Sequence, residues 1–108
     1  VGPGRARELM LTCERVPAER AYEIGLFNRV VPAGELVSAT RAMVTPLANG
    51  PRVAFRYLKD NLDDALVIDH ATAIEREAER MLRGQSTEDH KEAAGAFVEK
   101  REPQFVGR

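Results

Sequence analysis

The chain has 108 residues, of which 44% are hydrophobic and 31% charged, a balance typical of one globular domain with a modest core. Its 16 basic and 17 acidic side chains nearly cancel, so the overall charge predicts neither a nucleic-acid partner nor attraction to an anionic membrane. The single cysteine, Cys13, excludes an internal disulfide, and no apolar run approaches the roughly 20 residues needed to span a bilayer.

The first part of the chain predicts two short helices and one extended segment. Pro3 suits the first turn of a helix, and apolar residues recur on one face, so residues 3–12 are predicted to be helical. A second short helix fits PAERAYEIG, because Pro17 favours its start and Gly25 terminates it. The sequence FNRVV, residues 27–31, is the one plausible strand. Since one strand cannot form a sheet, it must pair with sequence outside this chain or remain extended.

The rest of the chain predicts four longer helices. Apolar side chains recur at helical spacing in residues 36–47, where Pro46 is expected to kink or shorten the last turn, and again in 51–65. The clearest stripe is in residues 67–83, which carry EREAER on the opposite side. Ser86 or Thr87 is suited to cap the last helix. The apolar stripes predict that these helices need partners to cover them.

Residue types associated with catalysis occur in settings that favour ordinary structural roles. Glu75 and Glu79 share a helix face with arginines, the usual pattern of a solvated surface. Cys13 is interpreted as a small buried residue rather than a nucleophile. His70, beside Asp69, suits a helix start, and His90 lies among charged residues. Two histidines and one cysteine offer no metal-ligand spacing, so no metal site is predicted.

Two long motifs resemble those of one enzyme family. VGPGRARELMLTCERVPAERAYEIGLFNRVVP resembles a G-x-x-x-A-x-x-L/M-x-L-T helix followed by G-E-x-x-x-A-x-x-A-x-x-x-G-L-V-x-x-V-V-P. EDHKEAAGAFVEKREPQFVGR resembles D-x-x-E-G-x-x-A-F-x-E-K-R-x-P-x-F. Both patterns, in this order, are those of the enoyl-CoA hydratase/isomerase, or crotonase, family. With the intervening helices in register, the resemblance spans essentially all 108 residues.

The resemblance implies a mainly α fold, the C-terminal helical region of a crotonase. Crotonases fold as stacked ββα turns that form a spiral, followed by helices that mediate trimer contacts and help to cover the active site. Residues 1–32 then correspond to the end of the spiral core, and residues 33–108 to the helical trimerisation and lid region. The chain opens without Met, which favours an internal start. Because the family's oxyanion-hole amides and catalytic carboxylates lie upstream of this region, no catalytic residue is expected here.

The function implied for the full-length protein is hydration or isomerisation of an enoyl-CoA thioester through a stabilised enolate, as a lyase or isomerase. Coenzyme A would enter as part of the substrate, with no covalently bound cofactor. The resemblance also implies a homo-oligomer, a trimer or a dimer of trimers, in the cytoplasm. This chain alone is expected to be inactive. The alternative is a stand-alone helical interaction or oligomerisation module without catalytic activity.

The resemblance assigns three binding residues. Phe97 and Lys100 match the family positions that approach the adenine and phosphate end of coenzyme A, where a ring can stack and an ammonium can pair with phosphate. Met81 matches a position that lines the acyl end of the pocket. The pattern alone also fits Phe97 and Met81 as core residues and Lys100 as a charge at a helix end.

The chain departs from the family pattern at three positions. Cys13 stands where glycine is common, so the turn after the first helix is expected to reach positive φ less readily. Ala93 also replaces a common glycine, which favours the helix. Pro46 interrupts a helix that is usually continuous. These changes concern local geometry.

Overall fold

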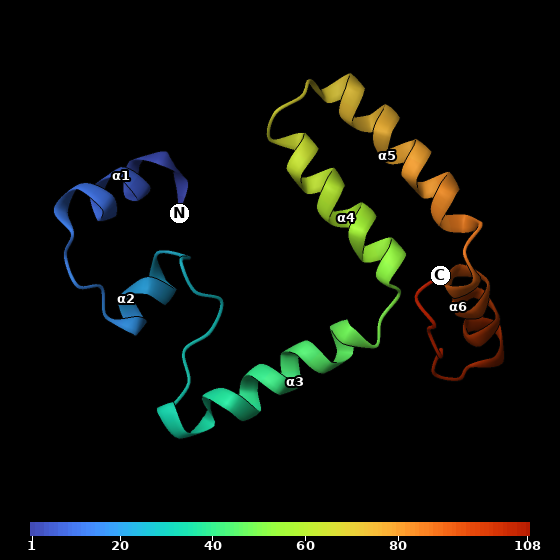
Figure 1. Cartoon of the computed structure of the whole chain (residues 1–108), viewed down its shortest axis with the longest axis horizontal. Helices are drawn as coiled ribbons and strands as arrows, with labels where there is room; N and C mark the ends of the chain where they lie inside the picture. The colour runs from blue at the N-terminus through green and yellow to red at the C-terminus, as the bar shows by residue number, and fades with distance from the viewer. The chain divides into compact units, whose positions relative to one another are not determined.

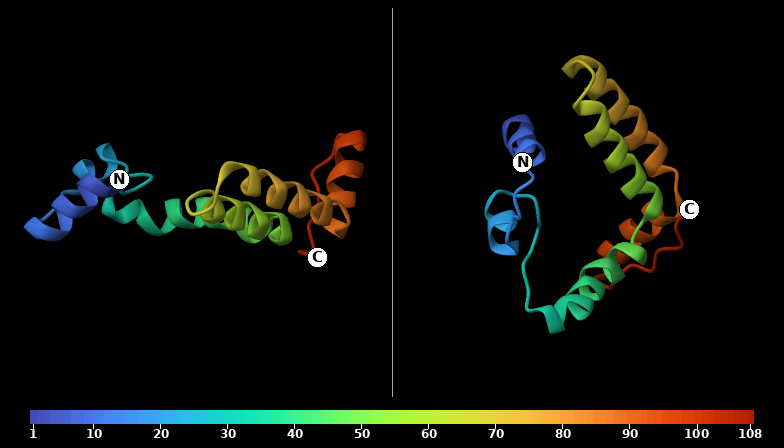
Figure 2. Two further views of the ribbon diagram at one scale, coloured as in Figure 1. Left: turned by 90° about the horizontal axis from the view of Figure 1, so that it is seen from above. Right: turned by 60° about the vertical axis from the view of Figure 1, so that its left-hand side comes forward.

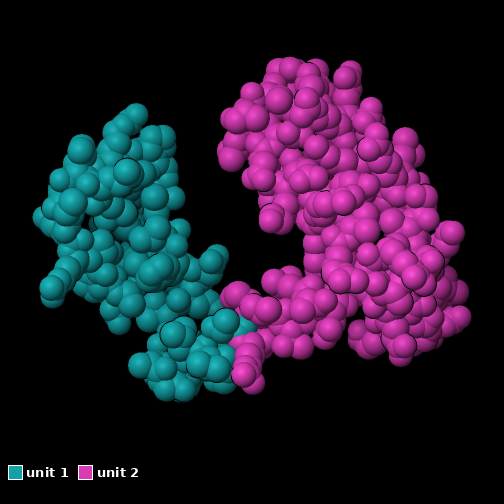
Figure 3. Space-filling model, in the orientation of Figure 1, with its two compact units in different colours: residues 1–40 teal, residues 41–108 magenta.

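The computed structural model describes all 108 residues and confirms the mainly α fold, with no β-strand (Figure 1). The chain divides into two compact units, residues 1–40 and 41–108, which Figure 3 shows in different colours. No helix combines the length and the apolarity needed to cross a membrane. The helices are α1 (Gly2–Thr12), α2 (Ala18–Glu23), the 3₁₀ turn η1 (Ala33–Glu35), α3 (Leu36–Ala48), α4 (Arg52–Ala65), α5 (His70–Gln85) and α6 (Glu88–Glu99).

In the first unit, α2 ends at Glu23, and Gly25 follows its cap residue Ile24 and terminates the helix, as the sequence predicts. The N–H of Gly25 donates to the Tyr22 carbonyl at 2.9 Å, and the N–H of Leu26 donates to the Ala21 carbonyl at 2.8 Å. This bond pattern needs a left-handed residue, and Gly25 has φ 75°. Ala21 and Ile24, both buried, are the core of this unit.

Cys13 corrects two expectations. It is exposed rather than buried, and it adopts the left-handed conformation, with φ 52° and ψ 26°, directly after α1. Its thiol lies 3.4 Å from the Met10 carbonyl oxygen, to which it donates a weak hydrogen bond. The Cβ atom therefore does not prevent the turn, although a non-glycine residue in this region raises the local energy by roughly 1 kcal/mol.

Residues 27–31 form no strand. They lie in bends and extended chain between α2 and η1. Of the two alternatives that the sequence left open, the extended segment is the one found here. The reason is that no other strand in the chain is available to bond the backbone of this segment.

The second half of the chain follows the predicted helices with shifted boundaries. Pro46 lies inside α3, which continues to Ala48, so the proline does not end the helix. The stripe predicted from residue 67 enters its helix only at His70, because Asp69 caps α5. The Asp69 carboxylate accepts the backbone N–H of Thr72 at 3.1 Å, and its hydrogen bonds to Thr72 lower the pKa of Asp69.

Helices α4 and α5 lie side by side, as Figures 1 and 2 show, and polar side chains join them. The Arg80 guanidinium donates to the Asn61 amide oxygen at 2.7 Å and to the Asp64 carboxylate at 2.6 Å. Arg76 donates to the other Asp64 oxygen at 3.0 Å. These two arginines lower the pKa of Asp64, Arg80 contributing most. Asp64 is therefore held ionised between α4 and α5.

Because this contact is polar, the apolar stripes of α4 and α5 are not used to pair the two helices. Leu58 and Leu62 on α4, and Ile74 and Met81 on α5, are between 52% and 69% exposed. In the whole chain, the buried apolar side chains are only Ala21, Ile24 and Ala96. The apolar stripes, which the sequence predicts to be covered by partners, are therefore not covered by any part of these 108 residues.

Gly50, which is buried between α3 and α4, allows a direct test of packing in the second unit. A Cβ atom at this position would collide with the Phe55 ring and would lie 3.2 Å from the Pro46 carbonyl oxygen. We expect Gly50→Ala to lower the free energy of unfolding by about 1–2 kcal/mol, measured by urea denaturation followed by circular dichroism. Gly95→Ala is the matched control, because the space around Gly95 is open. That change should instead stabilise α6 by about 0.5–1 kcal/mol, and equal effects would contradict this packing.

Candidate functional site

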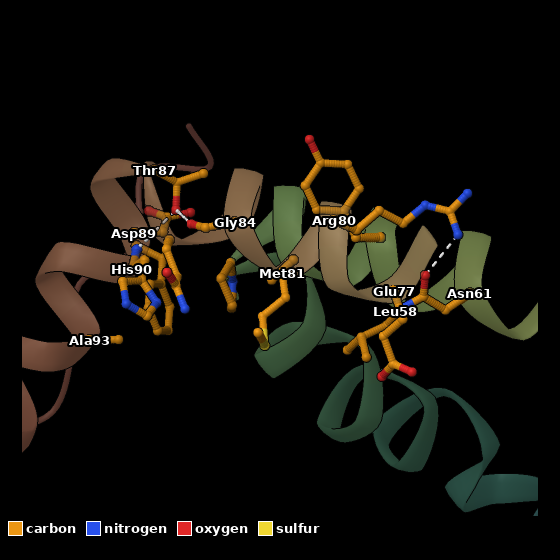
Figure 4. A pocket seen from close by; sticks show the side chains of 15 residues that line it. Leu58, Asn61, Glu77, Arg80, Met81, Gly84, Thr87, Asp89, His90 and Ala93 are labelled. Carbon is orange, nitrogen blue, oxygen red and sulfur yellow. Dashed lines mark hydrogen bonds between the residues drawn. The ribbon is translucent and has the colours of Figure 1, made fainter. Parts of the chain in front are cut away.

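A groove of about 500 Å³ lies between α4, α5, α6 and the C-terminal tail, all within the second unit (Figure 4). Its polar wall includes Arg80, bonded to Asn61, and the Thr87 hydroxyl, which donates to the Gly84 carbonyl at 2.7 Å. The apolar lining residues come from all three helices and the tail: Ala54, Leu58, Met81, Ala93 and Phe105. The groove can therefore hold an apolar chain beside a few polar groups.

Met81 lies in the middle of this groove. Figure 4 shows its side chain between Leu58 and Glu77 on one side and His90 and Ala93 on the other. The side chain is 59% exposed, so core packing within this chain does not account for it. A flexible thioether adapts to apolar surfaces of variable shape. Met81 thus occupies a position at which it can line a binding surface.

Phe97 and Lys100 lie outside the groove, at the C-terminal end of α6. Phe97 is 85% exposed, and the Lys100 ammonium has no ion-pair partner in this chain. The structure therefore joins Met81 with Phe105 in the groove and leaves the predicted pair, Phe97 and Lys100, together on a separate surface. An exposed ring and an unpaired cation three residues apart at one helix end can offer stacking and charge to a ligand.

The backbone at this helix end holds Lys100 in an unusual conformation. Lys100 has φ 55° and ψ 40°, in the left-handed region. Its N–H donates to the Phe97 carbonyl at 3.3 Å, and the N–H of Arg101 donates to the Ala96 carbonyl at 3.0 Å. Glycine is the residue that this cap favours, and lysine there costs roughly 1 kcal/mol. The sequence carries the lysine side chain at a position where its backbone is disfavoured.

Arg101 and Glu92 fix the chain just beyond this cap. The Arg101 guanidinium donates to both Glu92 oxygens, at 2.5 and 3.0 Å, and its Nε donates to Glu99 at 2.6 Å. The backbone N–H of Gln104 also donates to Glu92, at 2.9 Å. The Arg101 hydrogen bonds, followed by the Gln104 bond, lower the pKa of Glu92 from 4.5 to about 2. Glu92 therefore remains a carboxylate and anchors the tail to α6.

Asp89 anchors the end of the tail and is a residue whose position the sequence did not reveal. Its side chain is 2% exposed, and its carboxylate accepts the N–H of Val106 at 2.7 Å and that of Gly107 at 2.9 Å. Its own N–H donates to the Arg108 carbonyl at 3.1 Å. The sequence indicated only that an acid suits the first turn of this helix. Its tail partners lie 17 and 18 residues away, beyond any local pattern.

The histidines and carboxylates of this unit form no recognisable catalytic or metal-binding group. His90 lines the groove but is exposed, and no three His, Cys, Asp or Glu side chains group closely enough to bind a metal ion. The carboxyls of Asp64 and Glu92 have lowered pKa values, whereas a general acid near neutral pH needs a raised one. The geometry supports binding and packing more than it supports catalysis.

The Glu92 anchor predicts a pH dependence. The folded-state pKa of Glu92 lies below its ordinary value of 4.5, so its stabilising contribution is complete above pH 4.5 and is lost as the pH falls to about 2. We expect the difference in unfolding free energy between the wild type and Glu92→Gln to shrink over this interval. Denaturation at a series of pH values measures it.

Glu75→Gln is the control for this experiment, because Glu75 is exposed on α5 and its carboxylate makes no ion pair or side-chain hydrogen bond. The difference in unfolding free energy between Glu75→Gln and the wild type should change little between pH 4.5 and 2. A Glu92→Gln difference that is constant with pH would show that the Arg101 and Gln104 bonds do not stabilise the carboxylate.

The comparisons with known proteins agree on one family. The sequence model described as Enoyl-CoA hydratase/isomerase matches residues 1–108. The chain is similar to the short-chain-enoyl-CoA hydratase of Clostridium acetobutylicum, 35% identical over 101 residues, which is 94% of this chain and 39% of that protein. It is also similar to the crotonyl-CoA hydratase of Syntrophomonas wolfei, 32% identical over 108 residues, which is 100% of this chain and 42% of that protein.

Comparison with solved structures points to the same family. The structure superimposes on the crystal structure of enoyl-CoA hydratase from Bacillus anthracis with a TM-score of 0.91 and 31% identity, over 100% of this chain and 42% of that one. The chain thus spans between 39% and 42% of the length of the relatives that it matches.

Proposed function

This chain belongs to the enoyl-CoA hydratase/isomerase family, and we propose that it forms the C-terminal part of an enzyme that hydrates or isomerises an enoyl-CoA thioester. The observation that carries the proposal is that every residue of the chain matches the family, while the match reaches less than half the length of the relatives. In this proposal the chain contributes oligomer contacts, pocket cover and part of the coenzyme A site.

The proposed reaction adds water across, or moves, a double bond conjugated to the thioester carbonyl. Its intermediate is an enolate, which backbone N–H donors stabilise in an oxyanion hole. We assign those donors and the acid/base carboxylates to the rest of the enzyme. The state of the carboxylates here supports this assignment, because Asp64 and Glu92 are held ionised by arginines and Asp89 is occupied by tail amides.

The substrate contacts proposed for this chain are at two places. The exposed Phe97 ring can stack on the adenine of coenzyme A, and the unpaired Lys100 ammonium can bind a phosphate. Met81 would contact the acyl end, as the apolar lining of its groove supports. Coenzyme A is then part of the substrate, and the proposal needs no covalently bound cofactor.

The exposed stripes of α4 and α5 support a homo-oligomer, a trimer or a dimer of trimers, in which they pack against the spiral core or a neighbouring subunit. The enzyme would work in the cytoplasm. One exposed, unpaired cysteine, Cys13, fits a compartment that keeps thiols reduced.

The same exposed stripes also favour a second candidate, a stand-alone helical module that binds a partner or another copy of itself. This module would have no catalytic activity. The two candidates differ in the gene, since the enzyme requires a reading frame that extends upstream of Val1 and encodes the spiral core. Sequencing the transcript upstream of Val1 separates them.

The activity itself is tested with crotonyl-CoA. We expect the complete enzyme to hydrate this thioester, measured by the loss of absorbance of the conjugated double bond, because it combines the oxyanion hole with the carboxylates. The 108-residue chain alone should not exceed a buffer control. Hydration by the chain alone would place the acid/base groups within it and overturn their assignment to the rest of the enzyme.

The nucleotide contact is tested with Lys100→Ala in the complete enzyme. A contact remote from the reacting bond binds the ground and transition states about equally, so KM should rise while kcat is unchanged. A direct charge-assisted bond predicts a loss of about 1.5–3 kcal/mol, or at least tenfold in kcat/KM. An acyl-pantetheine substrate, which lacks the nucleotide, should show no loss.

Lys91→Ala is the matched control, because Lys91 is another exposed lysine on α6 and has no ion-pair partner. It should leave both substrates unaffected. An equal decrease in kcat/KM for acyl-CoA and acyl-pantetheine would mean that Lys100 does not contact the nucleotide, and that this end of α6 is structural.

A further inference from the structure

The C-terminal tail, residues 102–108, runs back along α6 (Figures 1 and 2) and is bonded to it at Glu92, at Asp89 and, through the Arg108 guanidinium at 3.1 Å, at Glu88. Near the cap, the N–H of Gln104 bonds to Glu92. At the first turn of α6, the N–H groups of Val106 and Gly107 bond to the buried Asp89 carboxylate. Helix α6 and its tail therefore close into one unit, and Asp89 receives more tail bonds than any other side chain.

The tail also connects α6 to α4. The Arg52 guanidinium, at the start of α4, donates to the Val106 carbonyl at 3.0 Å and lies directly against Gly107. The join between α5 and α6 is short, with Thr87 bonded to the Gly84 carbonyl. A single short join acts as a hinge, whereas a second attachment through the tail fixes the direction of α6. The direction of α6 relative to α4 and α5 therefore depends on the tail.

The tail in turn depends on Asp89. A buried carboxylate that accepts two backbone N–H groups makes charge-assisted hydrogen bonds, which are stronger than neutral ones. Breaking them leaves the Val106 and Gly107 amides without partners, and the segment that Arg52 contacts is then held to the start of α6 only by the backbone bond to the Arg108 carbonyl and the Arg108–Glu88 ion pair. The Glu92 anchor would still hold the tail near the cap. Loss of the Asp89 carboxylate therefore weakens the link between α6 and α4 while leaving the cap around Lys100 intact.

We propose that Asp89 is a positioning residue for substrate: through the tail and Arg52 it fixes α6, and so places Phe97 and Lys100 relative to the Met81 groove. This inference rests on the proposed function, in which α6 contacts the nucleotide and the groove contacts the acyl end. One thioester reaches both places only when the distance between them is fixed. Because α6 and Phe105 of the tail also line the groove, a misplaced α6 weakens binding at both places, and the loss is larger for a substrate that also uses the nucleotide contact.

The test is Asp89→Ala in the complete enzyme, assayed with an acyl-CoA and with the acyl-pantetheine of the same acyl group. We expect KM for the acyl-CoA to rise about tenfold and KM for the acyl-pantetheine to rise by no more than about threefold, because only the acyl-CoA loses the nucleotide contact. Amide hydrogen exchange at Val106 and Gly107 should become faster, because their carboxylate acceptor is gone. A general loss of structure would instead affect both substrates equally.

Asp63→Ala is the matched control, since Asp63 is an exposed aspartate on α4 with no ion-pair partner, and it should leave both substrates unaffected. Arg52→Ala gives a second variant in case Asp89→Ala does not fold. It removes the link to α4 but leaves the tail on α6, and it should raise KM more for the acyl-CoA than for the acyl-pantetheine.

The outcomes separate this inference from the proposed function. If the wild-type enzyme converts enoyl-CoA but Asp89→Ala and Arg52→Ala behave like Asp63→Ala, the positioning role is wrong and the function stands. The same conclusion follows if the variants raise KM equally for acyl-CoA and acyl-pantetheine. If the wild-type enzyme neither binds nor converts any enoyl-CoA, the proposed function fails, and the positioning role fails with it.

Discussion

The contact between Arg80 and the pair Asn61 and Asp64 is the interaction on which the arrangement of the second unit depends. It joins α4 to α5 through charged and amide groups, so the apolar stripes of these helices are not consumed in joining them. Leu58 and Met81 are left at an accessible surface, and a groove opens beside them. An apolar contact between α4 and α5 would have buried these stripes and removed the surface. The polar contact thus keeps apolar area available for a ligand or for another part of the protein.

The end of α6 combines a disfavoured backbone with an exposed phenylalanine and an unpaired lysine. Lys100 occupies a left-handed cap that glycine would satisfy at lower energy, and Phe97 gains little from burial in this chain. Arg101, bonded to Glu92 on the same helix, holds the chain that follows. Such local strain persists when surrounding bonds over-determine it, and it is concentrated at binding sites in proteins. The strained cap therefore agrees with the contact role that we propose for Lys100.

The C-terminal tail makes contacts between residues that are distant in the sequence. Residues that are 17 or more positions apart meet when Asp89 accepts the amides of Val106 and Gly107, and Arg52 adds a bond from α4. The two phenylalanines near the C-terminus consequently differ in their surroundings. Phe105 lines the groove, whereas Phe97 is exposed at the opposite end of α6. One short segment thereby links the groove to the surface that carries Lys100.

The sequence by itself determined which segments are helical and where most of them end. The Gly25 stop and the Thr87 cap are bonds between residues three to five apart, so local residue types are enough to predict them. The two long motifs likewise determined the family. The tertiary structure decided which helix faces pair, that residues 27–31 remain extended, and that Asp89 is buried beneath the tail. These features depend on partners distant in sequence or on the absence of a neighbouring strand, and apolar periodicity carries no information about such partners.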